Sequence, residues 1–236
     1  MTAFLFAVLA AAGNIAGAAA VTARPRWSPR SLELLLAFAA GFLLVVSLTG
    51  LLPEAVERGG REAALIVLVG FLLVHLTQHA LVGHFHFGEE THQVSRQVSA
   101  SALAGLLLHT IVDGVAIASA FQVQAELGML VFGAVFLHKV PEGLAIASLW
   151  IASGRSRASA LGAAGALGVA TVLGFVLTSI VDPLAEVGLA LSAGVTLYVG
   201  ASNLIPEFQG KAGWTHNLVF FVACGVALAL RALLGH

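Results

Sequence analysis

Two short segments of the sequence repeat a pattern of histidine, carboxylate and glycine, offset by 29 residues, from 109 to 138. His109 and Asp113 are four residues apart in the first segment, as are His138 and Glu142 in the second. A glycine follows each carboxylate, and both segments then continue as aliphatic-Ala-Ile-Ala-Ser. Residues four apart lie on one face of a helix. Two such helices facing each other would bring two imidazoles and two carboxylates together, which is a ligand set for a divalent metal.

The donor types limit the choice of ion. Two nitrogens and two carboxylates suit Zn²⁺ in tetrahedral geometry, and they also suit Fe²⁺ or Mn²⁺ with water at further positions. Cd²⁺ fits the same ligands, and no thiolate selects a soft ion. The sequence therefore predicts a divalent transition-metal site without deciding the metal.

The composition of the chain places this site in a membrane. Of the 236 residues, 59% are hydrophobic and only 10% are charged, and the mean hydropathy is +0.98. A soluble domain carries about 25% charged residues, so this chain has too few to cover a surface that faces water. The net charge of −1 says little about partners, but no basic patch indicates a nucleic-acid partner, and the single Cys224 excludes an internal disulfide.

The fold expected from this composition is an all-α polytopic membrane protein forming one transmembrane domain over residues 1–236. A helix needs about 20 apolar residues to cross the hydrocarbon core, and polar, Gly or Pro residues divide the chain into eight such runs. The expected helices lie near 2–23, 31–52, 63–84, 98–121, 126–150, 158–181, 184–206 and 214–234. Breaks are expected at 53–62 and 122–125 among others, and the longest loop, 85–97, carries several histidines.

Basic residues predict the orientation, because cytoplasmic loops retain Lys and Arg. With both termini outside, the basic residues of the cytoplasmic loops are Arg24, Arg26, Arg30, Arg96, Arg155, Arg157 and Lys211. Those outside are Arg58, Arg61 and Arg231. The majority on the cytoplasmic side favours an N-out, C-out topology.

This topology places both histidines of the repeated pattern at the same depth. His109 and His138 then lie about 16–18 Å from opposite faces, at 1.5 Å per helical residue, and these depths meet in the middle of a core about 30 Å thick. An ionised carboxylate there costs at least several kcal/mol unless it is paired. The competing interpretation is that the two His–carboxylate pairs only hydrogen-bond helices together. The duplication at matched depth favours a metal site between the fourth and fifth helices.

The two repeated motifs, the second with Pro141 before its carboxylate, resemble the fourth- and fifth-helix signatures of the ZIP (Zrt/Irt-like) divalent metal transporters, in their short bacterial-type form. The Leu-Leu-Pro-Glu at 51–54 and the Leu-Ile-Pro-Glu at 204–207 match as well. The resemblance implies transport of Zn²⁺, or of Fe²⁺, Mn²⁺ or Cd²⁺, toward the cytoplasm. It also implies a homodimer and an elevator-type movement of helices one, four, five and six against the other four. The metal site would be formed by His109, Asp113, His138 and Glu142. The short Ala-rich form suggests a bacterial inner (cytoplasmic) membrane.

The sequence departs from the ZIP pattern at two positions that help to bind a second metal in many members. Thr110 stands in place of Asn, and Lys139 stands in place of an acidic residue. A charged Lys has no lone pair for a metal, so we predict a single-metal site. Lys139 lies within helical reach of Glu142. It could hold the carboxylates ionised and exchange a proton during the metal cycle, or it could extend toward water, as long cations do.

Several further residues are candidates for an entrance or exit route. These are Glu54 and Glu207 at helix ends, His75 and His79 in the third helix, and His84, His86 and His92 in the loop. The helix-end carboxylates could instead be simply solvated, and the His75–His79 pair could be packed between helices. The loop histidines would catch or sense zinc, since neutral imidazole binds it, or else form a merely polar loop.

Two other classes of function compete with metal transport. An intramembrane zinc-dependent hydrolase would also need His and Asp around a zinc ion, but no separate base or oxyanion donor set is apparent in the sequence. An organic-cation or proton-coupled exchanger would use the carboxylates alone. The matched ligands on two helices favour a transporter, and the chain is not expected to be an enzyme.

Overall fold

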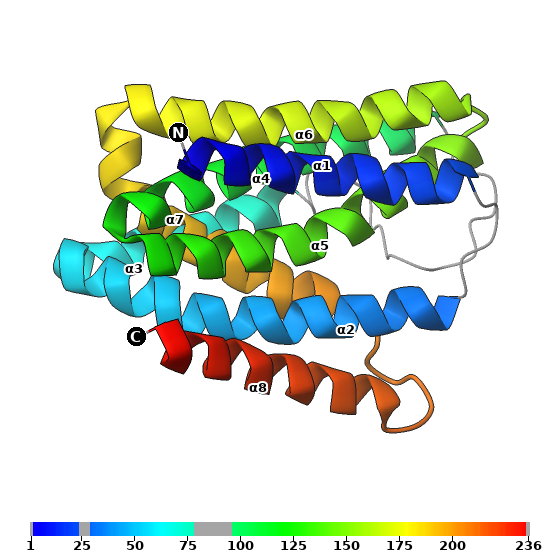
Figure 1. The fold of residues 1–236 in the computed structure, drawn as a ribbon. Helices are drawn as coiled ribbons and strands as arrows, with labels where there is room; N and C mark the ends of the chain where they lie inside the picture. The colour runs from blue at the N-terminus through cyan, green and yellow to red at the C-terminus, as the bar shows by residue number, and fades with distance from the viewer. Residues whose placement is uncertain (1, 24–28, 78–95, 235–236) are drawn as a thin grey trace.

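A computed structural model describes residues 2–23, 29–77 and 96–234, and this part of the chain is entirely helical apart from short connections (Figure 1). The elements in chain order are α1 (Thr2–Ala23), α2 (Pro29–Val45), η1 (Val46–Leu51), α3 (Leu52–Leu76), α4 (Arg96–Val123), α5 (Ala125–Ala152), α6 (Arg157–Ile180), α7 (Asp182–Tyr198), η3 (Val199–Leu204) and α8 (Thr215–Leu234). α5 lies between α1 and α2 in Figure 1, and the two chain ends lie at the same end of the bundle.

Seven helices of the described residues are long and apolar enough to cross a membrane. The count is seven because α2, η1 and α3 follow one another without a loop, so that Glu33–Leu76 forms one continuous stretch of 44 residues. The break expected at 53–62 is confirmed only as a kink at Gly60, where two helices of α3 meet, and the other residues of this range are helical. Pro53 occupies the first turn of α3, where its missing N–H costs nothing, and the Glu, Arg and Ala residues that follow are good helix formers. Only Gly60, with φ of 57°, leaves the helical conformation.

The helix boundaries nearest the repeated motifs also differ from expectation. α4 begins at Arg96, so the end of the expected 85–97 loop is helical. α4 and α5 are separated by Gln124 alone, rather than by the four residues expected at 122–125. This short connection makes α4 and α5 consecutive neighbours that run in opposite directions (Figure 1).

Glycines allow four pairs of helices to pack with their backbones in contact. A Cβ atom built on Gly143 of α5 would overlap the carbonyl oxygen of Asn14 in α1, and one on Gly114 of α4 would overlap a carbonyl of α6. The same holds for Gly194 of α7 against α3, and for Gly41 of α2 against α8. Small residues at such crossings are the usual means of close helix packing in membranes. The pairs are α1 with α5, α4 with α6, α3 with α7, and α2 with α8.

Two π-helical segments interrupt the regular helices at related places. η1 follows α2 and η3 follows α7, and a Pro-Glu pair follows each after one intervening residue, at 53–54 and 206–207. The backbone N–H of Leu52 bonds to the carbonyl of Ser47, and that of Ile205 to the carbonyl of Gly200, so each bond spans five residues. Such π-helical segments are frequent at functional sites, and η3 forms part of the wall of the cavity described below.

Candidate metal site

The structure brings His109 and Asp113 of α4 together with His138 and Glu142 of α5. One ligand atom from each of the four residues lies within 4.8 Å of the others. All four side chains are buried, with Asp113 only 2% exposed. The i, i+4 spacing puts each pair on one face of its helix, and the one-residue connection holds the two faces against each other.

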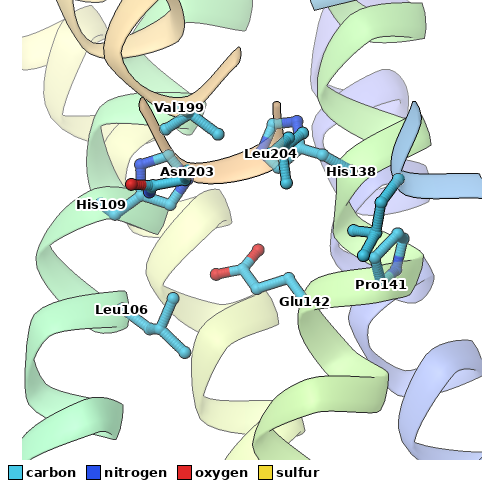
Figure 2. A pocket seen from close by; sticks show the side chains of 9 residues that line it. Leu106, His109, His138, Pro141, Glu142, Val199, Asn203 and Leu204 are labelled. Atoms are coloured by element: carbon cyan, nitrogen blue, oxygen red, sulfur yellow. The ribbon is translucent and has the colours of Figure 1, made fainter. Parts of the chain in front are cut away.

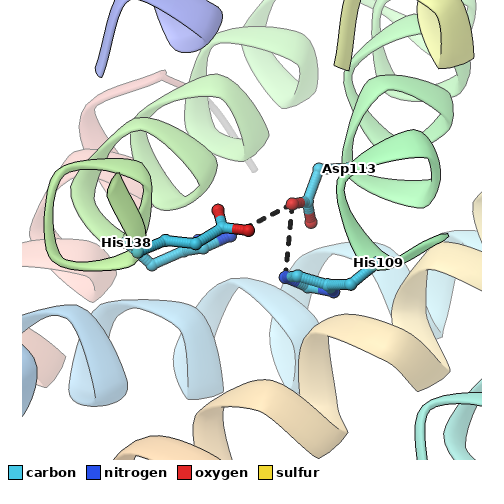
Figure 3. A group of neighbouring side chains, drawn as sticks. His109, Asp113 and His138 are labelled. Carbon is cyan, nitrogen blue, oxygen red and sulfur yellow. Dashed lines mark hydrogen bonds and ion pairs between the residues drawn. The ribbon is translucent and has the colours of Figure 1, made fainter. Parts of the chain in front are cut away.

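Asp113 lies at the centre of this group. Its Oδ2 atom is 3.3 Å from Nε2 of His109 and 3.3 Å from Nε2 of His138 (Figure 3). Donors bound at about 2.0–2.2 Å from one zinc ion in a tetrahedron lie about 3.3–3.6 Å apart. The two histidine–aspartate separations therefore have the length expected of ligands that share a single ion.

His138 has the tautomer that a metal ligand needs. Its Nδ1 atom lies 3.0 Å from the carbonyl oxygen of Ala134. A carbonyl can only accept, so Nδ1–H donates and the lone pair is on Nε2 when the ring is neutral. Backbone contacts of this kind commonly orient metal-binding histidines. The lone pair on Nε2 then faces Oδ2 of Asp113, which is also an acceptor. A cation or a proton bound between these two atoms would relieve their repulsion.

Lys139 lies between the two carboxylates. It is 0% exposed, and its Nζ atom is 2.6 Å from Oδ2 of Asp113 and 2.8 Å from Oε2 of Glu142. The interpretation in which Lys139 extends toward water is therefore wrong, because the carboxylates hold the ammonium group in the interior. Two carboxylates and one ammonium leave one net negative charge when both imidazoles are neutral.

Thr110 is buried beside the group but turns back on its own helix. Its hydroxyl donates to the carbonyls of Leu106, at 2.9 Å, and Leu107, at 3.0 Å. Such back-bonding is a common role of threonine within helices. In this arrangement the hydroxyl proton is engaged in hydrogen bonds within α4.

A cavity of about 30 Å³ adjoins His109, His138 and Glu142, which is room for about two water molecules. Figure 2 shows the Glu142 carboxylate directed into the space between α4 and α5, with Asn203 of η3 beside His109. The lining residues are Leu36, Leu106, His109, His138, Pro141, Glu142, Val199, Asn203 and Leu204. Oε1 of Glu142 is buried and makes no hydrogen bond in the described structure. This carboxylate oxygen is therefore available to a cation.

Of the remaining residues expected on an entrance or exit route, the three that the structure describes lie outside this group of ligands. Glu54 is half-buried and pairs with Arg58 at 2.7 Å, and Nδ1 of His75 lies 3.3 Å from the hydroxyl of Tyr198. Glu207 is half-buried in the turn that follows η3. His79, His84, His86 and His92 lie outside the described residues.

Two asparagines contact or line the site without having been singled out for it from the sequence. Asn203 lines the cavity, and Asn14 of α1 donates to Oε2 of Glu142 at 3.2 Å. Asn14 is the one polar side chain between residues 3 and 21. A lone polar residue in the middle of an apolar helix is a usable signal, since such groups bond to neighbouring helices.

Comparison with known proteins identifies the family. A sequence profile described as "ZIP Zinc transporter" matches residues 86–231, more than half of the chain. The chain is also 29% identical over 241 aligned positions to a protein of Escherichia fergusonii named "Zinc transporter ZupT", covering 95% of this chain and 93% of that protein. The apolar helices agree with an integral membrane protein of this kind. The chain belongs to the ZIP zinc transporter family, whose members are transporters and not enzymes.

Proposed function

We propose that this protein carries Zn²⁺ across a membrane toward the cytoplasm through one metal site formed by His109, Asp113, His138 and Glu142. The observation that carries the proposal is the convergence of two nitrogen and two oxygen ligands within 4.8 Å, buried in an apolar bundle. The name of the E. fergusonii relative supports zinc as the substrate. Fe²⁺, Mn²⁺ and Cd²⁺ remain alternative substrates, because the same ligands accept them.

The proposal includes a single bound metal. The ammonium group of Lys139 already puts one positive charge beside the carboxylates of Asp113 and Glu142. A second dication at the same carboxylates would be repelled by the ammonium group, and this repulsion is strong where water is excluded. Thr110 offers little compensation, because its hydroxyl proton is bonded to its own helix.

We further propose eight membrane crossings with both termini outside, in one transmembrane domain. The stretch Glu33–Leu76 would supply two of them, with the chain reversing at Gly60. Asn14 is 12 residues into α1, which is about 18 Å, the same depth as the two histidines. A bacterial inner membrane and a homodimer complete the proposal, as expectations from the family resemblance.

The packing supports an elevator-type movement of α1, α4, α5 and α6 against α2, α3, α7 and α8. The glycine crossings that bring backbones together join α1 to α5 and α4 to α6 in one group, and α3 to α7 and α2 to α8 in the other. Across the boundary, a Cβ atom built on Gly133 of α5 would be 3.8 Å from Phe42 of α2, an ordinary contact. The crossings in which backbones touch thus unite the helices of each group, whereas across the boundary Gly133 of α5 and Gly188 of α7 meet side chains.

The cavity lies on the cytoplasmic side of the metal site in the proposed topology, which supports an exit route on that side. Leu106 precedes His109 on α4, and Glu142 follows His138 on α5, so both lie on the cytoplasmic half in the proposed topology. On the other half, Ile117 and Val131 are fully buried. The metal would leave through the lined half when the moving helices are in this position.

The test is uptake of radioactive zinc into proteoliposomes, with competition by iron, manganese and cadmium. We expect His109→Ala, Asp113→Ala, His138→Ala and Glu142→Ala each to reduce uptake strongly. Glu126→Gln is the matched control, because Glu126 lies in the first turn of the same helix as Glu142, outside the site. Normal uptake by all four ligand variants would refute the proposal.

The alternative functions give different results in the same assay. An intramembrane hydrolase would bind zinc without moving it, and membership of a transporter family does not favour that class. An exchanger for organic cations would take up its substrate without being inhibited by zinc. Zinc accumulation against a blank liposome control therefore separates metal transport from both alternatives.

A further inference from the structure

Asn14 connects α1 to the proposed metal site. The side chain is 0% exposed, and its Nδ2 atom donates to the carbonyl of Lys139 at 3.3 Å and to Oε2 of Glu142 at 3.2 Å. Both partners are acceptors only, which fixes the orientation of the amide: in the reversed orientation its own oxygen would face two oxygens. Asn14 therefore acts as a donor toward α5.

The position of Asn14 is fixed by the backbone as well as by its side chain. A Cβ atom on Gly143 would overlap the Asn14 carbonyl, and one on Gly17 would overlap the carbonyl of Val140. A Cβ atom on Gly13 would be 3.0 Å from that of Lys139. The two helices are in contact on both sides of Asn14, so the amide has little freedom to move away from Glu142.

The two oxygens of Glu142 consequently have different surroundings. Oε2 accepts from Nζ of Lys139 at 2.8 Å and from Asn14 at 3.2 Å, whereas Oε1 is buried without a hydrogen-bond partner. Donors on one oxygen restrain rotation of the carboxylate and direct the other oxygen toward the cavity that Glu142 lines. A carboxylate held in this way binds a metal through one oxygen.

We propose that Asn14 is a positioning residue of the metal site, holding Oε2 of Glu142 so that Oε1 alone binds the transported dication. The inference rests on the proposed function, because it needs Glu142 to be a ligand. It adds α1, a third helix, to a site whose ligands all come from α4 and α5. A hydrogen-bond partner that orients a ligand in this way typically changes metal affinity by about 10–100-fold when it is lost.

The test is a double-mutant cycle on the purified full-length protein in detergent, with zinc affinity measured by calorimetry up to millimolar zinc. We expect Asn14→Ala to weaken zinc binding by about 10-fold. In a Glu142→Ala background the same substitution is expected to change affinity by less than about 2-fold, because no carboxylate remains to be positioned. Thr178→Ala is the control for loss of a buried polar side chain, since its hydroxyl bonds only to Gly174 of its own helix.

Each outcome separates the inference from the proposed function. Unchanged affinity in Asn14→Ala, or an equal loss in both backgrounds, would overturn the role of Asn14 while leaving Glu142 as a ligand. Unchanged affinity in Glu142→Ala would instead overturn the proposed ligand set. Asn14→Leu, which is close in size and favourable in a helix, repeats the test if Asn14→Ala does not fold. The absorption spectrum of bound Co²⁺ should change in either Asn14 variant and stay constant in Thr178→Ala.

Discussion

The two groups of helices differ sharply in what they bury. The group of α1, α4, α5 and α6 encloses two histidines, two carboxylates, one lysine and Asn14 in direct contact. In the group of α2, α3, α7 and α8, the buried ionisable side chains among the described residues are Tyr198 of α7 and His216, in the first turn of α8, which pairs with Glu33 at 3.1 Å. The difference indicates that one group carries the chemistry and the other supplies a mostly apolar wall, with Asn203 as its polar contribution to the cavity.

Among the variants that test this difference between the two groups, Asp113→Ala should have the largest effect on zinc uptake and on stability. The variant loses the oxygen shared by both histidines and leaves Lys139 with one partner, so we expect zinc uptake to fall to the background level. Breaking a buried ion pair costs about 3–5 kcal/mol, and the protein should therefore unfold at a lower temperature. The double variant Asp113→Ala, Lys139→Met should recover thermal stability without recovering uptake, whereas recovered uptake would show that Asp113 is not a ligand.

Lys139→Asp should convert the one-metal site into a two-metal site. The change replaces an ammonium group with a carboxylate at the point where Asp113 and Glu142 meet. We expect bound zinc, measured by elemental analysis after dialysis, to rise from about one to about two ions per chain. Lys139→Met should stay near one, because methionine is only a weak ligand for zinc. Two ions per chain in the wild-type protein would contradict the proposed role of Lys139.

The glycine crossings give a smaller effect that is measured as stability. A Cβ atom in Gly174→Ala would overlap the carbonyl of Ile111, so α6 and α4 must separate. Overpacking costs about 1–3 kcal/mol, which lowers Tm by about 2–10 °C in a chain of this size. Gly165→Ala on the same helix meets no atom within 4 Å and should raise Tm slightly, because alanine is the better helix former. Equal shifts in the two variants would refute the tight crossing.

The smallest effect is expected at the N-terminal end of α3. Glu54 pairs with Arg58 at a partly exposed position, where such a pair contributes about 0.2–1 kcal/mol. Glu54→Gln should therefore change the zinc uptake rate by less than about 2-fold. A loss comparable with that of Asp113→Ala would show that the carboxylate is part of the transport route.

The convergence of the four candidate ligands could be predicted because it depends on helical spacing and on a short connection. The four-residue spacing fixes the face of each helix, and the short connection between α4 and α5 makes them neighbours. The expected span boundaries were also close for α1, α4, α5 and α6. The same helical spacing predicts that Lys139 lies near Glu142, and the structure adds a contact between Lys139 and Asp113.

What could not be predicted depends on contacts between helices distant in sequence. The contact of Asn14 with Glu142 needs α1 to pack against α5, and no local pattern in either helix names the other as its partner. Pro53 and the charged residues predict a break at 53–62, and the structure has this break at Gly60 alone, because the residues around it keep their local helix preference. Composition identifies a charged segment at a membrane surface but does not decide whether it is a loop.

The most direct test of the central claim is an anomalous difference map from crystals of the protein soaked in zinc. We predict one strong peak per chain, about 2.0–2.2 Å from Nε2 of His109, Nε2 of His138, a carboxylate oxygen of Asp113 and Oε1 of Glu142. The absence of a peak between these side chains, or two peaks bridged by them, would contradict a single buried metal site.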